Sequence, residues 1–146
     1  MTATLRNQMV AIALEWQRRY SVAPSITATI SEYDAARLVG VPEERMADAI
    51  GDASAVRRGF DFSWDGVRYQ VKANRPSGRK GSPVTKCAKA SNYDFDVLLW
   101  LLYDPAYALH EAWRWDVADY ERVCGPLAHV RPQHMRLGAR LACLTP

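Results

Sequence analysis

The 146-residue chain lacks any apolar run long enough to cross a lipid bilayer. Its longest run, Val97 to Tyr103, has the size of a buried β-strand, whereas a membrane-spanning helix needs roughly 20 apolar residues. Near the N-terminus, Glu15 and Arg18 interrupt the continuous apolar segment that a secretory signal requires. We therefore expect no secretory signal and no membrane partner.

Cysteine is scarce as well. The chain has three, Cys87, Cys124 and Cys143, an odd number without the paired spacing of a metal-binding motif. This usage predicts reduced thiols in a cytoplasmic protein. A structural zinc site that combines these cysteines with His110 or His134 is the alternative.

Acidic residues are absent from Val67 to Tyr93, although the net charge of the whole chain is only +3. Within this stretch, segment 73–93 contains prolines and glycines and is predicted to be a loop. Such a loop can simply be a solvated surface, but clustered positive charge also attracts the phosphates of nucleic acid. The residues expected to contact DNA are Arg68, Asn74, Arg75, Arg79, Lys80, Lys86 and Lys89.

The composition excludes disorder, because 49% hydrophobic and 24% charged residues are typical of a folded globular protein. A chain of this length is expected to form one domain with its own core. We assign residues 1–146 to a single domain, with an N-terminal packing helix at about 4–20, a core at about 31–123 and a basic tail at 124–146.

Two alternating segments flank Asp65-Gly66, a dipeptide that predicts a two-residue type I′ turn. The turn fixes a register in which Trp64 faces Val67 and Asp61 faces Gln70. One face of this hairpin is then apolar and is expected to be core, with Phe60, Phe62, Trp64, Val67, Tyr69 and Val71. The opposite face is polar, with Asp61, Ser63, Arg68, Gln70, Lys72 and Asn74.

The polar face of the hairpin is the main candidate site. Asp61 and Gln70 are expected to have Cβ atoms roughly 5 Å apart, with Lys72 on the diagonal within reach of both. An acid, a second oxygen ligand and an ammonium on rigid strands are what a metal-dependent phosphodiesterase needs. The alternative, that these residues are only the solvated side of a half-exposed hairpin, stays open.

Helices are predicted at 4–20, 32–39, 42–50 and 117–123, with a loop at 51–58. The first helix is expected to pack through the apolar positions Leu5, Met9, Ile12, Ala13 and Trp16. Ser31 is expected to cap the second helix and Gly40 to end it. Glu32 then lies in the first turn, where a carboxylate can simply complement the helix dipole.

Two strands are predicted after the basic loop, at 94–103 and 106–115. The first has no polar face, which predicts a fully buried central strand. The second is expected to run antiparallel to it, to be followed by a helix that Asp116 caps, and to share one face among Tyr107, Leu109, Glu111, Trp113 and Trp115. The tail after Cys124 is not assigned to any element.

An acid on a helix, then Asp, then Gln-x-Lys on a hairpin, then an apolar strand resembles the PD-(D/E)xK nuclease superfamily. The matching residues are Glu32, Asp61, Gln70 and Lys72, and the resemblance covers roughly residues 31–120. It implies an α/β fold with a restriction-endonuclease-like core, in which helices flank a mixed central sheet of about four strands.

The resemblance further implies a Mg²⁺-dependent endonuclease that hydrolyses DNA phosphodiester bonds, with Mn²⁺ as a substitute metal. It makes Asp61, Gln70, Glu32 and the backbone carbonyl of Val71 metal ligands. Lys72 would stabilise hydroxide and the developing phosphorane charge. Gln70 departs from the usual Glu or Asp of the family, which removes one negative charge and weakens metal binding.

Partners follow from the same resemblance. A single small domain that reaches both strands of a duplex is expected to act as a homodimer. One alternative is a non-catalytic nucleic-acid-binding module whose metal site has decayed at Gln70. Another is a subunit of a larger defence or mobile-element complex, in which a protein partner completes the assembly.

Overall fold

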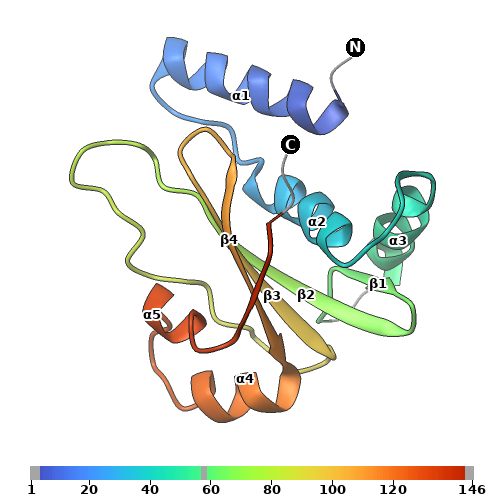
Figure 1. Ribbon diagram of the computed structural model, residues 1–146. Coiled ribbons are helices and arrows are strands. Elements are labelled where there is room, and N and C mark those ends of the chain that lie inside the picture. Colours follow the sequence, from blue (N-terminus) through green and yellow to red (C-terminus); the bar gives the residue numbers. More distant parts are fainter. Residues whose placement is uncertain (1–3, 57–58, 144–146) are drawn as a thin grey trace.

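The computed structural model describes residues 4–56 and 59–143, and Figure 1 shows helices packed around one β-sheet. The elements within these ranges are α1 (Leu5–Tyr20), α2 (Thr27–Leu38), α3 (Glu43–Val56), β1 (Phe62–Trp64), β2 (Val67–Asn74), β3 (Val97–Tyr103), β4 (Leu109–Asp116), α4 (Val117–Cys124), α5 (Pro132–Met135) and β5 (Ala139–Leu141). None of the helices in these ranges combines the length and the apolar character that crossing a membrane requires.

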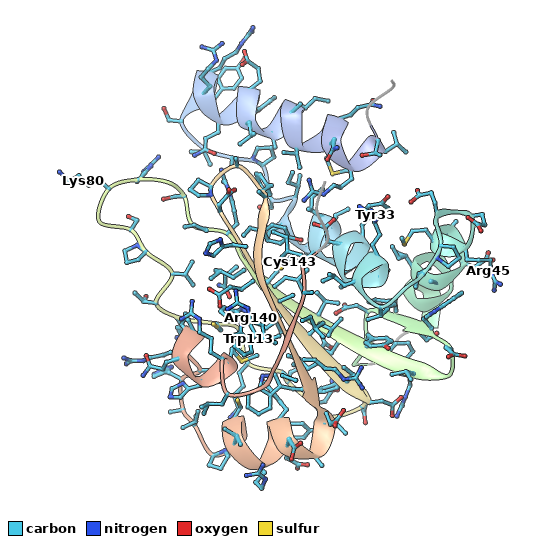
Figure 2. All side chains as sticks on the ribbon, viewed as in Figure 1. Tyr33, Arg45, Lys80, Trp113, Arg140 and Cys143 are labelled. Carbon is cyan, nitrogen blue, oxygen red and sulfur yellow. The ribbon has the colours of Figure 1, made fainter. Side chains whose placement is uncertain are left out.

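The sheet is mixed and has the order β1-β2-β3-β4-β5. β2 and β3 run parallel, and every other neighbouring pair is antiparallel. The predicted α/β class with a mixed sheet is confirmed, but the sheet has five strands because the unassigned tail supplies β5. There the Arg140 guanidinium lies 5.6 Å from the ring centre of Trp113 on β4, and Figure 2 shows the two side chains close together.

Two apolar cores lie on opposite faces of the sheet. The first core is packed against α2 and α3, and includes Ile30, Ala35, Val71, Leu99 and Leu101. The second core is packed against α4 and α5, and includes Leu98, Trp100, Trp115, Tyr120 and Met135. β3 contributes to both cores, which confirms the prediction of a buried central strand.

The hairpin of β1 and β2 has the predicted register, with Trp64 paired with Val67 and Phe62 with Tyr69. Asp65 and Gly66 adopt φ values of 52° and 78°, as a type I′ turn requires. Phe60 is the exception to the predicted face, since it packs into the second core while Phe62 packs into the first. The reason is that regular alternation begins only where β1 starts.

The predicted start of α2 was wrong. The helix begins at Thr27, so Ser31 is buried inside it and its hydroxyl donates to the Ala28 carbonyl at 2.9 Å. The predicted end is confirmed: Gly40 has φ 95°, its N–H bonds to Arg37, and the next N–H, of Val41, bonds to Ala36. These two bonds form a Schellman motif.

α3 and β4 also depart from the predictions. α3 continues to Val56, so residues 51–56 are helical and not a loop, while 57–58 lie outside the described residues. In β4 the register shifts opposite Leu102 and Tyr103. Leu109 and Tyr107 therefore pack into the first core, apart from Glu111, Trp113 and Trp115, because one extra residue reverses the alternation.

The first helix occupies the predicted residues, and its cap, Thr4, accepts from the Asn7 N–H at 3.1 Å. Of its predicted packing positions only Ala13 is buried. The helix buries Val10 and Ala13, whereas Leu5, Ile12 and Trp16 are exposed.

Candidate active site at the edge of strand β2

The candidate site lies at a sheet edge that β1 only partly covers. β1 has three residues, and its last ladder contact is the Asp61 N–H donating to the Tyr69 carbonyl at 2.7 Å. β1 does not pair with the rest of β2. There the Asp61 side chain takes the place of a strand residue, since its Oδ2 accepts from the Val71 N–H at 2.7 Å. A carboxylate thus satisfies the first backbone donor that the strand leaves open.

The carbonyl of Val71 faces the same edge. Along a strand, successive residues direct their backbone groups to alternate sides, and the Arg68 carbonyl accepts from Asp96 on the β3 side. Tyr69 and Val71 therefore direct their N–H and C=O groups away from β3. The result is a carboxylate and a backbone carbonyl oxygen next to each other at the open edge.

Gln70 completes this contact from the polar face of β2. Its Nε2 donates to Asp61 Oδ2 at 2.9 Å, and both side chains are half-buried. The predicted proximity of Asp61 and Gln70 is therefore confirmed. The carboxylate oxygen receives one hydrogen bond from the amide side chain and one from the backbone, which hold it in one position.

Lys72 follows two residues later on the same face of β2 and is half-buried. Among the residues that the structure describes, its ammonium makes no hydrogen bond or ion pair. A cation in this position is available to an anionic ligand.

Glu32 comes from α2, which packs against β2 and β1 from the side of the first core. The residue is half-buried on that helix. α2 covers the face of β2 that carries Tyr69 and Val71, whereas Gln70 and Lys72 lie on the other face. The predicted grouping of Glu32 with Asp61 and Gln70 therefore stays a prediction.

Gly59 fixes the approach of the chain to Asp61. It has φ 82°, and a side chain there would meet the Asn92 side-chain oxygen and the Cβ of Asp94, 2.8 Å away. Only glycine lets the loop before β3 pack this closely against the start of the hairpin. Gly59 is therefore a positioning residue for Asp61.

Arg68 binds within the molecule. Its guanidinium forms an ion pair with Asp96 at 3.2 Å, and its N–H donates to the same carboxylate at 2.8 Å. The side-chain hydrogen bond from Arg68 lowers the pKa of Asp96. This exposed pair joins the start of β2 to the start of β3, so the guanidinium is already engaged within the molecule.

Three other cations of the basic loop also have intramolecular partners. Arg75 lies over the ring of Tyr107, 4.3 Å from its centre, and donates to the Gln17 side chain at 2.7 Å. Arg79 donates to the Ser21 carbonyl at 2.8 Å. Lys89 donates to the Gly125 and Leu127 carbonyls, at 2.7 and 2.9 Å. These contacts dock the loop on α1 and on the end of α4.

Asn74 brings the returning half of the loop next to the candidate site. Its Oδ1 accepts from the Trp100 indole at 2.9 Å, and its Nδ2 donates to the Lys86 carbonyl at 3.2 Å. The exposed Lys86 is thereby held near the end of the face that carries Lys72. The need of a buried indole N–H for an acceptor was the sequence signal that could have predicted this role.

Lys80 lies at the far end of the same loop, exposed and directed away from the body of the protein (Figure 2). Within residues 4–56 and 59–143, neither Lys80 nor Lys86 has a side-chain partner. Of the basic residues predicted to contact DNA, these two therefore have uncommitted ammonium groups.

Sequence reasoning missed a buried acid on α2. Asp34 is only 7% exposed, and it accepts from Arg6 at 2.8 Å and from the Tyr103 hydroxyl at 2.6 Å. Burial and the neighbouring carboxylate raise the pKa of Tyr103. The three side chains join α1, α2 and β3, which indicates a structural role.

The fit of a metal can be judged from the donors. The described residues contain no cluster of three or more His, Cys, Asp or Glu side chains that could hold an ion. The cysteines are free, and burial raises the pKa of Cys87 to about 11. At the β2 edge the donors are oxygens: the Asp61 carboxylate, the Val71 carbonyl and, after rotation of its amide, Gln70 Oε1. Oxygen donors with few carboxylates suit weakly held Mg²⁺, which keeps several water ligands.

Comparison with models of known protein families gives no match. Comparison with curated proteins gives no significant relative. The functional argument for this chain therefore depends on its own residues and their arrangement.

Proposed function

We propose that the protein is a Mg²⁺-dependent endonuclease that hydrolyses phosphodiester bonds in DNA. The observation that carries the proposal is the arrangement at the open edge of β2. There Asp61 contacts Gln70 and the Val71 backbone, and Lys72 lies next on the same face. This is the arrangement that the resemblance to the PD-(D/E)xK superfamily leads us to expect.

The metal would be held by Asp61, the Val71 carbonyl and Gln70 Oε1, with Glu32 as a further ligand. Gln70 would exchange its Nε2 for its Oε1 by turning the amide, a change that keeps the shape of the side chain. Bound Mg²⁺, or Mn²⁺ in its place, would polarise the phosphate and lower the pKa of the attacking water.

Lys72 would supply the positive charge that the reaction needs beyond the metal. Its ammonium would orient hydroxide and stabilise the negative charge that develops on the phosphorane. Lys86 and Lys80 would contact phosphates on either side of the cleaved bond, which positions the strand without reading its sequence.

Cleavage of supercoiled plasmid and branched DNA with Mg²⁺ or Mn²⁺ tests the proposal. We expect Asp61→Asn and Lys72→Met each to lower the cleavage rate by at least about 100-fold, a typical loss for a catalytic group. Both substitutions keep the size of the side chain, so the fold should survive.

Ser63→Ala is the matched control for these variants. Ser63 lies on the same face of the hairpin and is exposed, so its loss should leave the rate unchanged. Unchanged cleavage by both Asp61→Asn and Lys72→Met would remove this site from the reaction.

A second candidate function is a non-catalytic nucleic-acid-binding module. The specific observation in its favour is that Gln70 directs its Nε2 to Asp61, which pairs the carboxylate without a metal. This alternative predicts DNA binding that weakens with salt and with Lys80→Ala or Lys86→Ala. It also predicts no Mn²⁺ binding and no effect of Asp61→Asn on DNA affinity.

Cleavage of both strands of a duplex by one small domain requires a second active site. We propose that a second copy of this chain supplies it. A protein partner in a larger complex is the alternative, and a stable hetero-complex on purification would be its sign.

A further inference from the structure

The exposed large apolar side chains of the described residues are concentrated on one helix. Leu137 is 65% exposed elsewhere on the surface, and the others belong to α1 or follow it directly: Leu5 at 82%, Met9 at 37%, Ile12 at 67%, Trp16 at 52%, Tyr20 at 60% and Val22 at 66%. In Figure 1, α1 lies at one end of the molecule and no other element lies beyond it. We call these six residues the α1 patch.

The contacts of α1 with the rest of the protein do not use this patch. The helix buries Val10 and Ala13 and packs Leu14 against the first core, and polar contacts also hold it to the body. Arg6 donates to Asp34 at 2.8 Å and Gln17 to the Ser77 carbonyl at 3.2 Å. The inner side of the helix thus makes these contacts, while the residues of the α1 patch face outward, although the apolar face of a surface helix usually lies against the core.

The spacing of the patch suits a second helix. Leu5, Met9, Ile12 and Trp16 are separated by four, three and four residues, which is the spacing of a seam between two packed helices. From the exposed fractions, the patch offers roughly 600 Å² of apolar surface, with its aromatic rings supplying a large part. Stable interfaces bury about 800 Å² on each partner, so the patch with a polar rim around it has the size of a dimer interface.

The charged residues of α1 favour a second α1 helix as the partner and favour an antiparallel direction for it. Glu15 is paired within α1 with Arg18 at 2.6 Å and Arg19 at 2.7 Å, and Arg6 faces inward to Asp34. A parallel pair of helices would place the two Arg18-Arg19 ends together, where they would repel. An antiparallel pair places each basic end against the partner's first helical turn, where Arg6, the one charged residue among 4–8, faces inward. It also opposes the two helix dipoles.

We infer that the α1 patch is the homodimer interface, occupied by α1 of a second copy in antiparallel orientation. Leu5 of one copy then lies opposite Trp16 of the other, and Met9 opposite Ile12. The basic loop follows α1 through the contacts of Gln17 with Ser77 and of Arg79 with Ser21. The dimer would therefore present one basic loop at each end of the interface, and the use of both loops on one duplex rests on the proposed function.

Sedimentation equilibrium of the full chain, without metal or DNA, tests the interface independently of any nuclease activity. We expect the wild type to be a dimer, and the double substitution Ile12→Glu with Trp16→Glu to raise the dissociation constant at least about 100-fold. Because both side chains are exposed, the variant should keep its circular dichroism spectrum and melting temperature.

Leu137→Glu is the matched control, since Leu137 is as exposed as Ile12 but lies outside the patch. This variant should remain a dimer. A wild type that stays monomeric at the highest concentration measured, whether or not it binds lipid vesicles, would overturn the inference. So would a double variant that stays dimeric.

Disulfide cross-linking tests the relative direction of the two α1 helices separately. Oxidation of mixed Leu5→Cys and Trp16→Cys chains should give mainly the mixed disulfide-linked dimer if the helices are antiparallel. Dimers that each link two copies of the same variant would contradict the antiparallel arrangement.

Discussion

At the scale of single residues, Gln70 decides how the candidate site behaves without a metal. Its Nε2 donates to Asp61 at 2.9 Å, which a carboxylate at the same position could not do. A Glu there would place two negative charges together and would need a cation between them. With glutamine at this position the contact is stable without a cation, and we expect any metal to bind more weakly here than beside two carboxylates.

The sequence was sufficient to predict that Asp61 and Gln70 meet, because the Asp65-Gly66 turn fixes the register between them. Once the two side chains meet, the Nε2 end of the Gln70 amide has to face Asp61, because an ionised carboxylate only accepts hydrogen bonds. The sequence could not predict that the Asp61 side chain also accepts from the Val71 N–H. Nor could it predict that Arg68 and Lys89 bind within the molecule, because their partners, Asp96 and the carbonyls after α4, are distant in sequence.

Glu111 carries a testable dependence of stability on pH. It is 7% exposed and accepts from Arg136 at 2.8 and 2.9 Å and from the Trp113 indole at 2.9 Å. The Arg136 hydrogen bonds lower the pKa of Glu111 from 4.5 to about 2. The carboxyl protonates more readily in the unfolded chain, so this stabilisation is complete above about pH 4.5 and is lost as the pH falls toward about 2.

We expect the free energy of unfolding of the wild type to fall on the order of 2–3 kcal/mol more than that of Glu111→Gln between about pH 5 and about pH 2. Urea denaturation at a series of pH values measures the difference. Glu15→Gln is the control, because its ion pairs with arginine are exposed to water and salt and contribute little. Parallel pH profiles for the wild type and Glu111→Gln would show that this carboxylate has no such role.

At the scale of elements, the sequence predicted best where a short local motif determines the conformation. The type I′ turn and the Schellman motif at Gly40 are examples. It predicted worst where tertiary packing decides. α2 begins four residues before the apparent cap at Ser31, and the three-residue β5 exists only through its pairing with β4.

The two glycines Gly66 and Gly51 give an element-scale prediction of opposite sign. Gly66 has φ 78°, which strains any other residue, so Gly66→Ala should destabilise the protein by about 1–2 kcal/mol. Gly51 lies inside α3, and a Cβ added there would meet no other atom within 4 Å, so Gly51→Ala should stabilise the protein by about 0.5–1 kcal/mol. Urea denaturation of both variants measures the two changes. Effects of the same sign would contradict the assignment of turn and helix.

At the scale of the whole molecule, the candidate site depends on segments that are far apart in the chain. The hairpin supplies Asp61, Gln70 and Lys72, α2 packs against the other face of β2, and Asn74 docks the basic loop through Lys86. The resemblance to the nuclease superfamily was enough to identify the candidate residues. The open edge beyond β1 and the docking of the basic loop, however, arise only when the sheet is assembled. They could not be read from the order of residues.

The arrangement of the whole molecule also explains why the buried face of α1 was predicted incorrectly at most positions. An amphipathic pattern predicts that a helix has an apolar face, but it does not say whether the body of the protein or another chain covers that face. Here the body takes the side with Val10 and Ala13, and the patch with Ile12 and Trp16 is left outward. This outward apolar patch is the reason to infer that a second copy of the chain packs against α1.

The central claim is that the edge of β2 is a divalent-metal site, and calorimetric titration of the intact protein with Mn²⁺ tests it most directly. We predict weak binding at one site in the wild type, loss of binding in Asp61→Asn, and affinity at least about tenfold higher in Gln70→Glu, where a second carboxylate adds charge to the site. Wild-type binding that persists in Asp61→Asn, or an absence of binding even in Gln70→Glu, would contradict the claim.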